Sequence, residues 1–383
     1  MANWSGQLKF NDIFLTITNQ VIRQKVFDLQ VYDTKKDLAE MSKIEGGMLG
    51  DCILFYAMHE GKTFEWLNDA EAANLLKLHR PKDPECQAIT IDQFRMIPLT
   101  VDQYMTKRAF MDMNVFGMFN SVILSAIQKT KDIYESTFFN AFVGTHKAGL
   151  EANGKGAAQN LQIKIPAKPT NATEANLEAY NRLVAETIAE AMANLIVDLS
   201  DITQNYNDYG IRSSFNPDEL VYAWNSDWVN KIRKFGEPML FNKDGLIDKF
   251  AQHTLPARYF GNVNASSGTT GATNTTIRSL IEKDYNTVEP HDAGYETSLH
   301  IFPGDLLPAN TAYGANETYT EDPNIPFKVF HKESIPFAQA TQLSSEFYNP
   351  RSATSTHYLI WGYASLTHLK NLPFVTAEVV VAE

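Results

Sequence analysis

The segment Gly149-Leu-Glu-Ala-Asn-Gly-Lys-Gly156 comes nearest to a nucleotide-binding motif in this sequence. In a phosphate-binding loop, backbone amides and a lysine surround the phosphates, and the eighth residue supplies a hydroxyl to the metal. Here the eighth residue is Gly156, and the segment follows a predicted helix instead of a strand. We therefore interpret it as a glycine-rich turn, and nucleotide binding is the alternative that its lysine leaves open.

Possible metal ligands are concentrated at Glu289, His291 and Asp292. Two of the three are adjacent, and no second histidine lies at a spacing that would let both side chains reach one ion. The nine histidines include no His-x-x-x-His pair, and 266–268 (Ser-Ser-Gly) lacks the Gly-x-Ser-x-Gly pattern of a nucleophilic serine. The sequence therefore predicts no catalytic residue, no cofactor and no metal, and a protein that is not an enzyme.

Only two cysteines occur, Cys52 and Cys86, and they do not form a Cys-x-x-Cys pair. In a reducing cytoplasm a disulfide between them is not expected. We predict that both are small, half-buried apolar residues.

Composition limits the classes of function further. The chain has 383 residues, of which 44% are hydrophobic and 20% charged, and this predicts a folded protein with more than one lobe. Its net charge is -12 and it has no Lys/Arg block, so avid binding to nucleic acid is not expected. No apolar run reaches the roughly 18–20 residues that span a bilayer. The first residues do not form a secretory signal, so we expect the newly made chain to be in a cytoplasm.

The strongest periodic signal lies at about 113–143, where apolar or small residues recur mostly every three or four positions. That spacing predicts one long helix, on the order of 45 Å, around which the rest of the fold is arranged. Gly144 and Gly149 are predicted to stop it.

Two strands are predicted before this helix. Residues 52–58 are apolar on both faces, and 88–97 alternate with an irregularity near Gln93 and an end at Pro98. About thirty polar or weakly helical residues separate the two strands, so together they predict a long two-stranded excursion. Earlier in the chain, 11–30 predicts a short amphipathic helix or arm.

The second half mixes helices and strands. Residues 161–165 predict a strand, and Asn171 with Glu174 resembles a capping box that opens a second long helix. Residues 219–224 predict a strand that leads into a helix. Surface loops are predicted at 264–276 and 310–326, and late strands at 327–330, 357–363 and 374–381. The order contains neither a βαβ series nor an internal repeat, which favours an α+β fold.

This order of elements resembles that of the major capsid proteins of tailed bacteriophages, which have the Hong Kong 97-type fold. The likeness is most evident at Gln87-Ala-Ile-Thr-Ile-Asp-Gln-Phe-Arg-Met-Ile-Pro-Leu99 and at the helix segment that runs from Asn114 to Glu135. In these two segments the chain is most similar to capsid proteins of small short-tailed, picovirus-like podophages. The likeness in sequence covers about 50–145, and in the remainder of the chain the likeness lies in the order of the elements.

The resemblance implies a division of the chain into five parts. These are an N-terminal arm at 1–45, an extended hairpin (E-loop) at 46–103, a peripheral domain with the spine helix at 104–167, an axial domain with a surface insertion at 168–340, and C-terminal strands at 341–383 that return to the peripheral domain.

The resemblance also implies a structural protein that forms pentamers and hexamers of itself in an icosahedral or prolate shell around a double-stranded DNA genome. The expected partners are other copies of the chain, a separate scaffolding protein during assembly, a portal protein, and packaged DNA that is contacted weakly; no membrane is expected. The expected location is the virion, after assembly in the cytoplasm of a host bacterium.

Three alternatives remain at this point. A bacterial nanocompartment (encapsulin-like) shell shares the fold, although this chain is longer and its hairpin more elaborate. A cytosolic enzyme whose site is not motif-like would instead form a small oligomer with a well-formed pocket. The third is another virion part, such as a tail or collar protein.

Overall fold

The computed structural model describes residues 37–48, 50–63, 78, 80–102, 113–149, 156–170, 173–235, 253–265 and 317–382. These residues form a six-stranded sheet, a five-stranded sheet, a two-stranded ribbon and several helices, so the mixed α+β composition is confirmed. The helix or arm predicted at 11–30 lies outside the described residues. No helix within the described part of the chain is long and apolar enough to cross a membrane.

The predicted long helix is present as α4, Met113–Thr145, whose 33 residues at about 1.5 Å each make it roughly 50 Å long. The helix ends at Thr145, one residue beyond the predicted stop at Gly144. A Cβ atom on Gly144 would come 1.9 Å from the carbonyl oxygen of Tyr259, so close approach of another segment requires a glycine. The helix end is stabilised by Lys328, whose Nζ donates to the carbonyls of Gly144 and His146 at 2.7 Å each.

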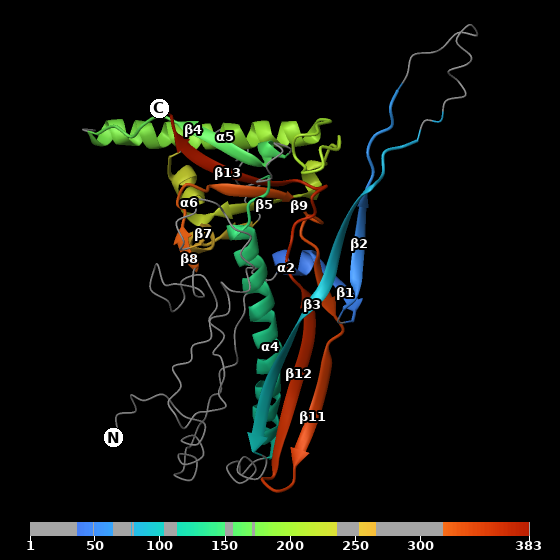
Figure 1. Cartoon of the computed structure of the whole chain (residues 1–383). Helices are drawn as coiled ribbons and strands as arrows, with labels where there is room; N and C mark the ends of the chain where they lie inside the picture. The colour runs from blue at the N-terminus through green and yellow to red at the C-terminus, as the bar shows by residue number, and fades with distance from the viewer. Residues whose placement is uncertain are drawn as a thin grey trace.

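The first sheet lies along α4, as Figure 1 shows. Its strands follow the order β1-β10-β12-β3-β2, and β11 also pairs with β12. Their bounds are Lys43–Gly47 (β1), Cys52–Ala57 (β2), Glu85–Asp102 (β3), Phe337–Ala340 (β10), Leu343–Asn349 (β11) and Thr354–Ala364 (β12). Strands β2 and β3 pair antiparallel over Cys52–Ala57 and Glu85–Thr90, which places the two predicted strands side by side.

Strand β3 is longer than predicted, because it continues past Pro98 to Asp102. Along 91–102 it pairs with β12, and no described strand pairs with its other side there. Proline is tolerated on such an edge, where its missing N–H removes no ladder hydrogen bond if the nitrogen faces outward. The irregularity predicted near Gln93 is confirmed: Tyr363 pairs with Gln93 and the next residue of β12 pairs with Ile91, which leaves Asp92 as an extra residue.

The second sheet has the strand order β4-β13-β9-β5-β6. The bounds are Asn160–Ile165 (β4), Leu220–Asn225 (β5), His253–Leu255 (β6), Phe327–His331 (β9) and Phe374–Val381 (β13). The strands predicted at 161–165, 219–224, 327–330 and 374–381 all lie in this sheet. Every residue of β5 and β9 is buried, which explains why β5 reads as an almost continuous apolar run.

Two helices pack on the second sheet. Helix α5 spans Glu174–Ser200 and places Val184, Ile188 and Leu195 in the same buried cluster as residues of the sheet. Helix α6, Ser226–Phe235, begins where β5 ends. The predicted capping box at Asn171 is wrong: the N-cap of α5 is Thr173, two residues later, and its side chain makes no capping hydrogen bond. In Figure 1, α5 lies roughly crosswise to α4, beyond its C-terminal end.

Several short elements were not predicted. They are α2 (Asp37–Met41), three single-turn 3-10 helices (η3, Ala157–Gln159; η4, Pro217–Glu219; η6, Ala257–Tyr259), and the strands β1, β6, β10 and β11. The ribbon β7 (Gly261–Ala265) and β8 (Glu317–Glu321) is antiparallel and lies partly in the ranges predicted as loops. The loop predictions are therefore wrong at those strands, and 266–316 lies outside the described residues.

Candidate functional site

The segment that resembled a phosphate-binding loop follows α4 and precedes η3, as its sequence context indicated. Gly149 and Gly156 both have positive φ, and a Cβ on Gly149 would lie 2.3 Å from the carbonyl oxygen of Gly156, so the two ends meet closely. The residues between them, and the groups near 266–268 and 289–292, lie outside the described residues. Where the chain is described, no group of three or more His, Cys, Asp or Glu side chains is placed to hold a metal.

The prediction of two half-buried cysteines is wrong. Cys52 and Cys86 are both free and exposed, on paired strands of the hairpin. Cys52 lies opposite Thr90 and Cys86 lies opposite Tyr56, so the two thiols are four residues apart along the ladder. Whether one face of a hairpin is exposed depends on which other segment covers it, and the local sequence carries no information about that segment.

The register of the first sheet places apolar side chains on one of its faces. Residues directly opposite each other across antiparallel strands point to the same face. Met96 pairs with Ile360, which pairs with Leu343, so these three residues form one apolar row across β3, β12 and β11. On the same face, the row on one side adds Phe94. The rows on the other side add Pro98, Tyr358, Thr100, Thr356 and Phe347.

This face, which we name the open face, is exposed. Phe94, Met96, Leu343 and Phe347 are between 50% and 64% exposed, and Tyr358 and Ile360 are half-buried. A contiguous apolar surface of this kind is unusual on a monomer and is characteristic of a surface that contacts another molecule.

The hairpin presents a similar set of side chains. Leu54, Tyr56 and Met58 are between 50% and 61% exposed, although β2 reads as a strand with apolar residues on both faces. Ile53 and Phe55 point the other way and pack on a buried cluster that includes Ile89. The hairpin therefore buries one face on its own chain and leaves the other apolar face uncovered.

The opposite face of the first sheet is covered by α4. Tyr134 packs against Trp361 with ring centroids 6.1 Å apart, and Phe138 packs against Tyr363 at 5.4 Å. Arg95, which pairs with Trp361, places its guanidinium 5.7 Å from the centre of the Tyr134 ring. The aromatic side chains of Tyr134 and Phe138 on α4 thus pack the helix against this face of the sheet.

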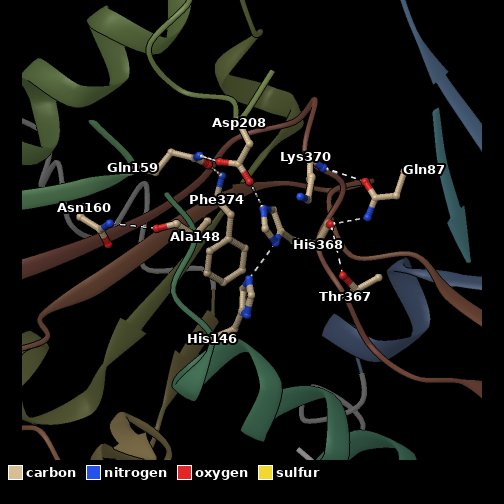
Figure 2. Close-up of polar contacts among 10 residues, drawn as sticks. All are labelled: Gln87, His146, Ala148, Gln159, Asn160, Asp208, Thr367, His368, Lys370 and Phe374. Carbon is tan, nitrogen blue, oxygen red and sulfur yellow. Dashed lines mark hydrogen bonds and ion pairs between the residues drawn. The ribbon is translucent and has the colours of Figure 1, made fainter. Parts of the chain in front are cut away.

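A polar joint connects the base of the hairpin to the rest of the chain (Figure 2). The Gln87 side chain, on β3, donates to the carbonyl of His368 at 2.9 Å and accepts from the backbone N–H of Lys370 at 3.0 Å. The carbonyl of Lys370 in turn accepts from the backbone N–H of Asp208 at 2.8 Å. Because His368 and Lys370 lie in the 365–373 loop between β12 and β13, this loop joins the hairpin to both sheets.

Two histidines lie at the centre of the joint. His146 Nε2 is 2.8 Å from His368 Nδ1, and His368 Nε2 is 3.2 Å from a carboxylate oxygen of Asp208. The other oxygen of Asp208 accepts from Gln159 Nε2 at 2.7 Å, and Gln159 Oε1 accepts from the backbone N–H of Phe374 at 3.0 Å. Figure 2 shows the two imidazoles end to end, with the Phe374 ring beside them.

The electrostatics of this region disfavour positive charge. Burial, with further contributions from His368 and Lys328, holds the pKa of His146 well below its usual value. Burial and the nearby Lys147 likewise lower the pKa of Lys328 well below that of an ordinary lysine, although Glu378 and Asp322 oppose this shift. Lys147 forms an ion pair with Glu378 at the outer side of the cluster.

The sequence did not indicate the joint or β11. His146, Asp208 and His368 are far apart in the chain and match no motif, so only the fold brings them together. Strand β11 reads Leu-Ser-Ser-Glu-Phe-Tyr-Asn, and all seven residues are exposed, so it lacks the alternation that identifies a half-buried strand.

No protein-family model matches the chain, and no curated protein matches it. Solved structures do match. A chain from the capsid structure of Staphylococcus phage Andhra is 12% identical, with a TM-score of 0.60 over 99% of this chain and 95% of that chain. A chain from the structure of the head fiber and inner core protein gp22 of native bacteriophage P68 is 12% identical, with a TM-score of 0.61 over 94% of this chain and 88% of that chain. At this identity the likeness shows the fold, a mixed helix-and-sheet fold that also occurs in a phage capsid structure.

Proposed function

We propose that this chain is the major capsid protein of a tailed bacteriophage, of the Hong Kong 97 type and like those of the short-tailed, picovirus-like podophages. In this role it assembles with copies of itself into pentamers and hexamers that close a shell around double-stranded DNA, and it catalyses no reaction. Its location is then the virion, after assembly in the cytoplasm of a bacterium.

The exposed apolar hairpin carries the proposal. Leu54, Tyr56 and Met58 leave an apolar face in solvent, and a further apolar row lies on the open face of the same sheet. An isolated two-stranded hairpin is marginal in water, and its unpaired edge favours aggregation unless another chain covers it. A neighbouring copy that covers these surfaces head to tail would account for both of them, and such contacts close into rings.

The five-part division of the chain belongs to the same proposal. We assign 1–45 to the arm, 46–103 to the extended hairpin, 104–167 to the peripheral domain with α4, 168–340 to the axial domain and 341–383 to the returning strands. The pairing of β12 with β3 and the burial of α5 in its own cluster support two lobes around α4 and α5.

The proposed partners follow from the same role. A scaffolding protein and a portal protein are separate chains in this scheme. The net charge of -12 suits a wall that surrounds DNA and contacts it weakly, because clustered cations would be needed to bind its phosphates tightly.

The test is electron microscopy in negative stain, with light scattering, of the full-length chain expressed with and without the candidate scaffolding protein. We expect closed shells, tubes, or five- and six-fold rings. The double variant Leu54→Ser/Tyr56→Ser should lose these particles while it keeps a folded, soluble subunit. Leu183→Ser, on α5 and 48% exposed, is the matched control and should still assemble.

A monomer or a small dimer of the unmodified chain under all conditions would contradict the proposal and favour a cytosolic enzyme. Shells that form without any phage partner and enclose a cargo enzyme would favour the nanocompartment alternative. Normal shells from the Leu54→Ser/Tyr56→Ser variant would show that the hairpin is not the contact between copies.

A further inference from the structure

The 365–373 loop covers the inner face of the hairpin at its base. Leu369 is buried in the same cluster as Ile89 and Ile91 of β3, and Ile53 and Phe55 of β2 pack against that cluster. Gln87 adds two hydrogen bonds between β3 and the loop. The direction in which the hairpin leaves the body therefore depends on where this loop is held.

The histidine pair is one of the contacts that hold the loop. A carboxylate only accepts, so a proton on His368 Nε2 is directed to Asp208 at 3.2 Å. In a neutral ring the other nitrogen, Nδ1, then accepts a hydrogen bond from the Nε2–H of His146 at 2.8 Å. Asp208 is fixed by Gln159. Each ring N–H in the chain Gln159–Asp208–His368–His146 has an acceptor when the pair carries two protons in total.

A third proton disrupts this arrangement. If it binds His368 Nδ1, two N–H groups face each other across 2.8 Å. If His146 changes tautomer to accept, its Nδ1–H is directed into a site where the rings of Phe142 and Phe374 lie 4.7 and 5.1 Å from the His146 ring. No acceptor for that N–H is found in the described part of the chain.

The groups that face the pair from each packed element do not offset the added charge equally. The end of α4 contributes Lys147, β9 contributes Lys328, and the loop itself contributes Lys370. Acidic groups are Asp208, which already accepts from His368 and Gln159, Glu378 on β13, which pairs with Lys147, and Asp322 near Lys328. Lys328 lies on the His146 side, where its Nζ donates to the His146 carbonyl at 2.7 Å. Among the described residues, the positive charge that a third proton adds is therefore compensated by Asp208 alone.

We propose that the His146–His368 pair is an acid-sensitive latch, which at neutral pH holds the 365–373 loop and through Gln87 the base of the β2–β3 hairpin, and which releases both when it takes up a proton. This inference concerns the conformation of the single chain and does not require that the chain form a shell. The low pKa of His146 agrees with the geometry, because the open form then binds the proton at a higher pH than the closed form does.

Hydrogen–deuterium exchange of the purified full-length chain, read by mass spectrometry at pH 7.5 and 5.5, tests the latch. All variants are compared in one assembly state, and rates are corrected for the pH dependence of intrinsic exchange. We expect peptides from 85–91 and 365–373 to lose protection at pH 5.5, because one coupled proton raises the opening equilibrium by up to about tenfold per pH unit. Peptides from β5 should keep their protection.

His146→Gln should abolish this pH response in both segments. His331→Gln is the matched control: His331 lies in β9 and its pKa is also lowered by burial. Its contact with the loop is a backbone hydrogen bond to the Pro373 carbonyl at 3.2 Å, which glutamine can also make, so the response should persist. Gln87→Ala leaves both histidines in place and should uncouple the segments, so that 85–91 exchanges quickly at both pH values while 365–373 still responds. Gln87→Ala provides the test if His146→Gln fails to fold.

Equal corrected protection at both pH values in the unmodified chain would overturn the latch. A full pH response in His146→Gln would do the same, and so would an unchanged exchange of 85–91 in Gln87→Ala. Failure of the chain to form particles would leave these measurements valid, so the latch and the proposed capsid role are tested separately.

Discussion

Single polar residues buried in the core support the ends of the main elements. Lys328 is fully buried, and its Nζ satisfies the carbonyls of Gly144 and His146 at the end of α4. A lysine is rarely buried so deeply, and the two acceptors explain why this one is tolerated. The residue therefore acts as a cap for the longest helix and not as a surface charge.

Lys328→Met should lower the free energy of unfolding by about 1–3 kcal/mol, because two buried carbonyls lose their donor. It should also change the pH dependence of stability. In wild type the folded pKa lies below the unfolded value, so the unfolded state binds the extra proton and stability rises with pH up to about 10.4. Urea unfolding between pH 7 and 9.5 should show this rise in wild type and not in Lys328→Met. The exposed Lys332→Met is the control, and a wild-type slope in Lys328→Met would contradict the assignment.

Gly144→Ala should be strongly destabilising, since the added Cβ would meet the carbonyl oxygen of Tyr259 at 1.9 Å inside a packed helix. Overpacking of this kind costs about 1–3 kcal/mol or more, which thermal unfolding would detect as a lower Tm. Gly61→Ala is the control, because nothing lies within 4 Å of its Cβ position, and its Tm should stay near that of wild type. Equal Tm values for the two variants would show that Tyr259 moves away without cost.

At the scale of elements, α4 is connected to the first sheet by a buried ion pair as well as by aromatic packing. Glu135 is fully buried on α4 and lies 2.9 Å from Lys43 Nζ on β1 and 3.5 Å from Lys131 Nζ one turn earlier. Lys131 also donates to Gln342 between β10 and β11 at 2.8 Å. One carboxylate thus links the helix to a strand that precedes it by about ninety residues.

Glu135→Gln should lower the free energy of unfolding by about 2–4 kcal/mol, because it leaves buried Lys131 and half-buried Lys43 without their anion. Glu186→Gln on α5 removes an exposed pair with Arg182 at the same i,i+4 spacing and should change stability by less than about 1 kcal/mol. Chemical denaturation of both variants measures the difference. Equal effects would mean that water solvates the Glu135 site.

At the scale of the whole molecule, two apolar surfaces remain exposed to solvent in addition to the packed core. The open face, opposite α4 and its aromatic core, and the outer face of the hairpin both belong to the first sheet. A monomer gains nothing from such surfaces, whereas a second copy that covered them would bury them.

Met96→Ser/Phe347→Ser should therefore reduce assembly of the chain while it preserves the fold. Both side chains are more than half exposed, so the free energy of unfolding of the single chain should change by less than about 1 kcal/mol. Light scattering and sedimentation should show fewer large particles, and circular dichroism should be unchanged. Val197→Ser on α5, 67% exposed, is the control and should assemble as wild type does.

Features that depend on neighbours in the sequence could be predicted from the sequence. Helix α4 was predicted within two residues of its ends, and β13 was predicted at its observed bounds, 374–381. The bulge at Asp92 was expected near Gln93 because the alternation of apolar residues changes phase there. These features follow from periodicity, since one turn of a helix or one step of a strand determines which side chains share a face.

Features that depend on distant neighbours were decided by the tertiary structure. The exposure of Cys52 and Cys86, the strand β11 and the need for glycine at position 144 each follow from what lies across space, not along the chain. The joint of His146, Asp208 and His368 belongs to this class, because three loops must converge before their side chains can meet. The sequence by itself thus determined the long helices and the strands with a clear apolar pattern, together with their order. Only packing decided which apolar residues stay uncovered, and therefore where another molecule can bind.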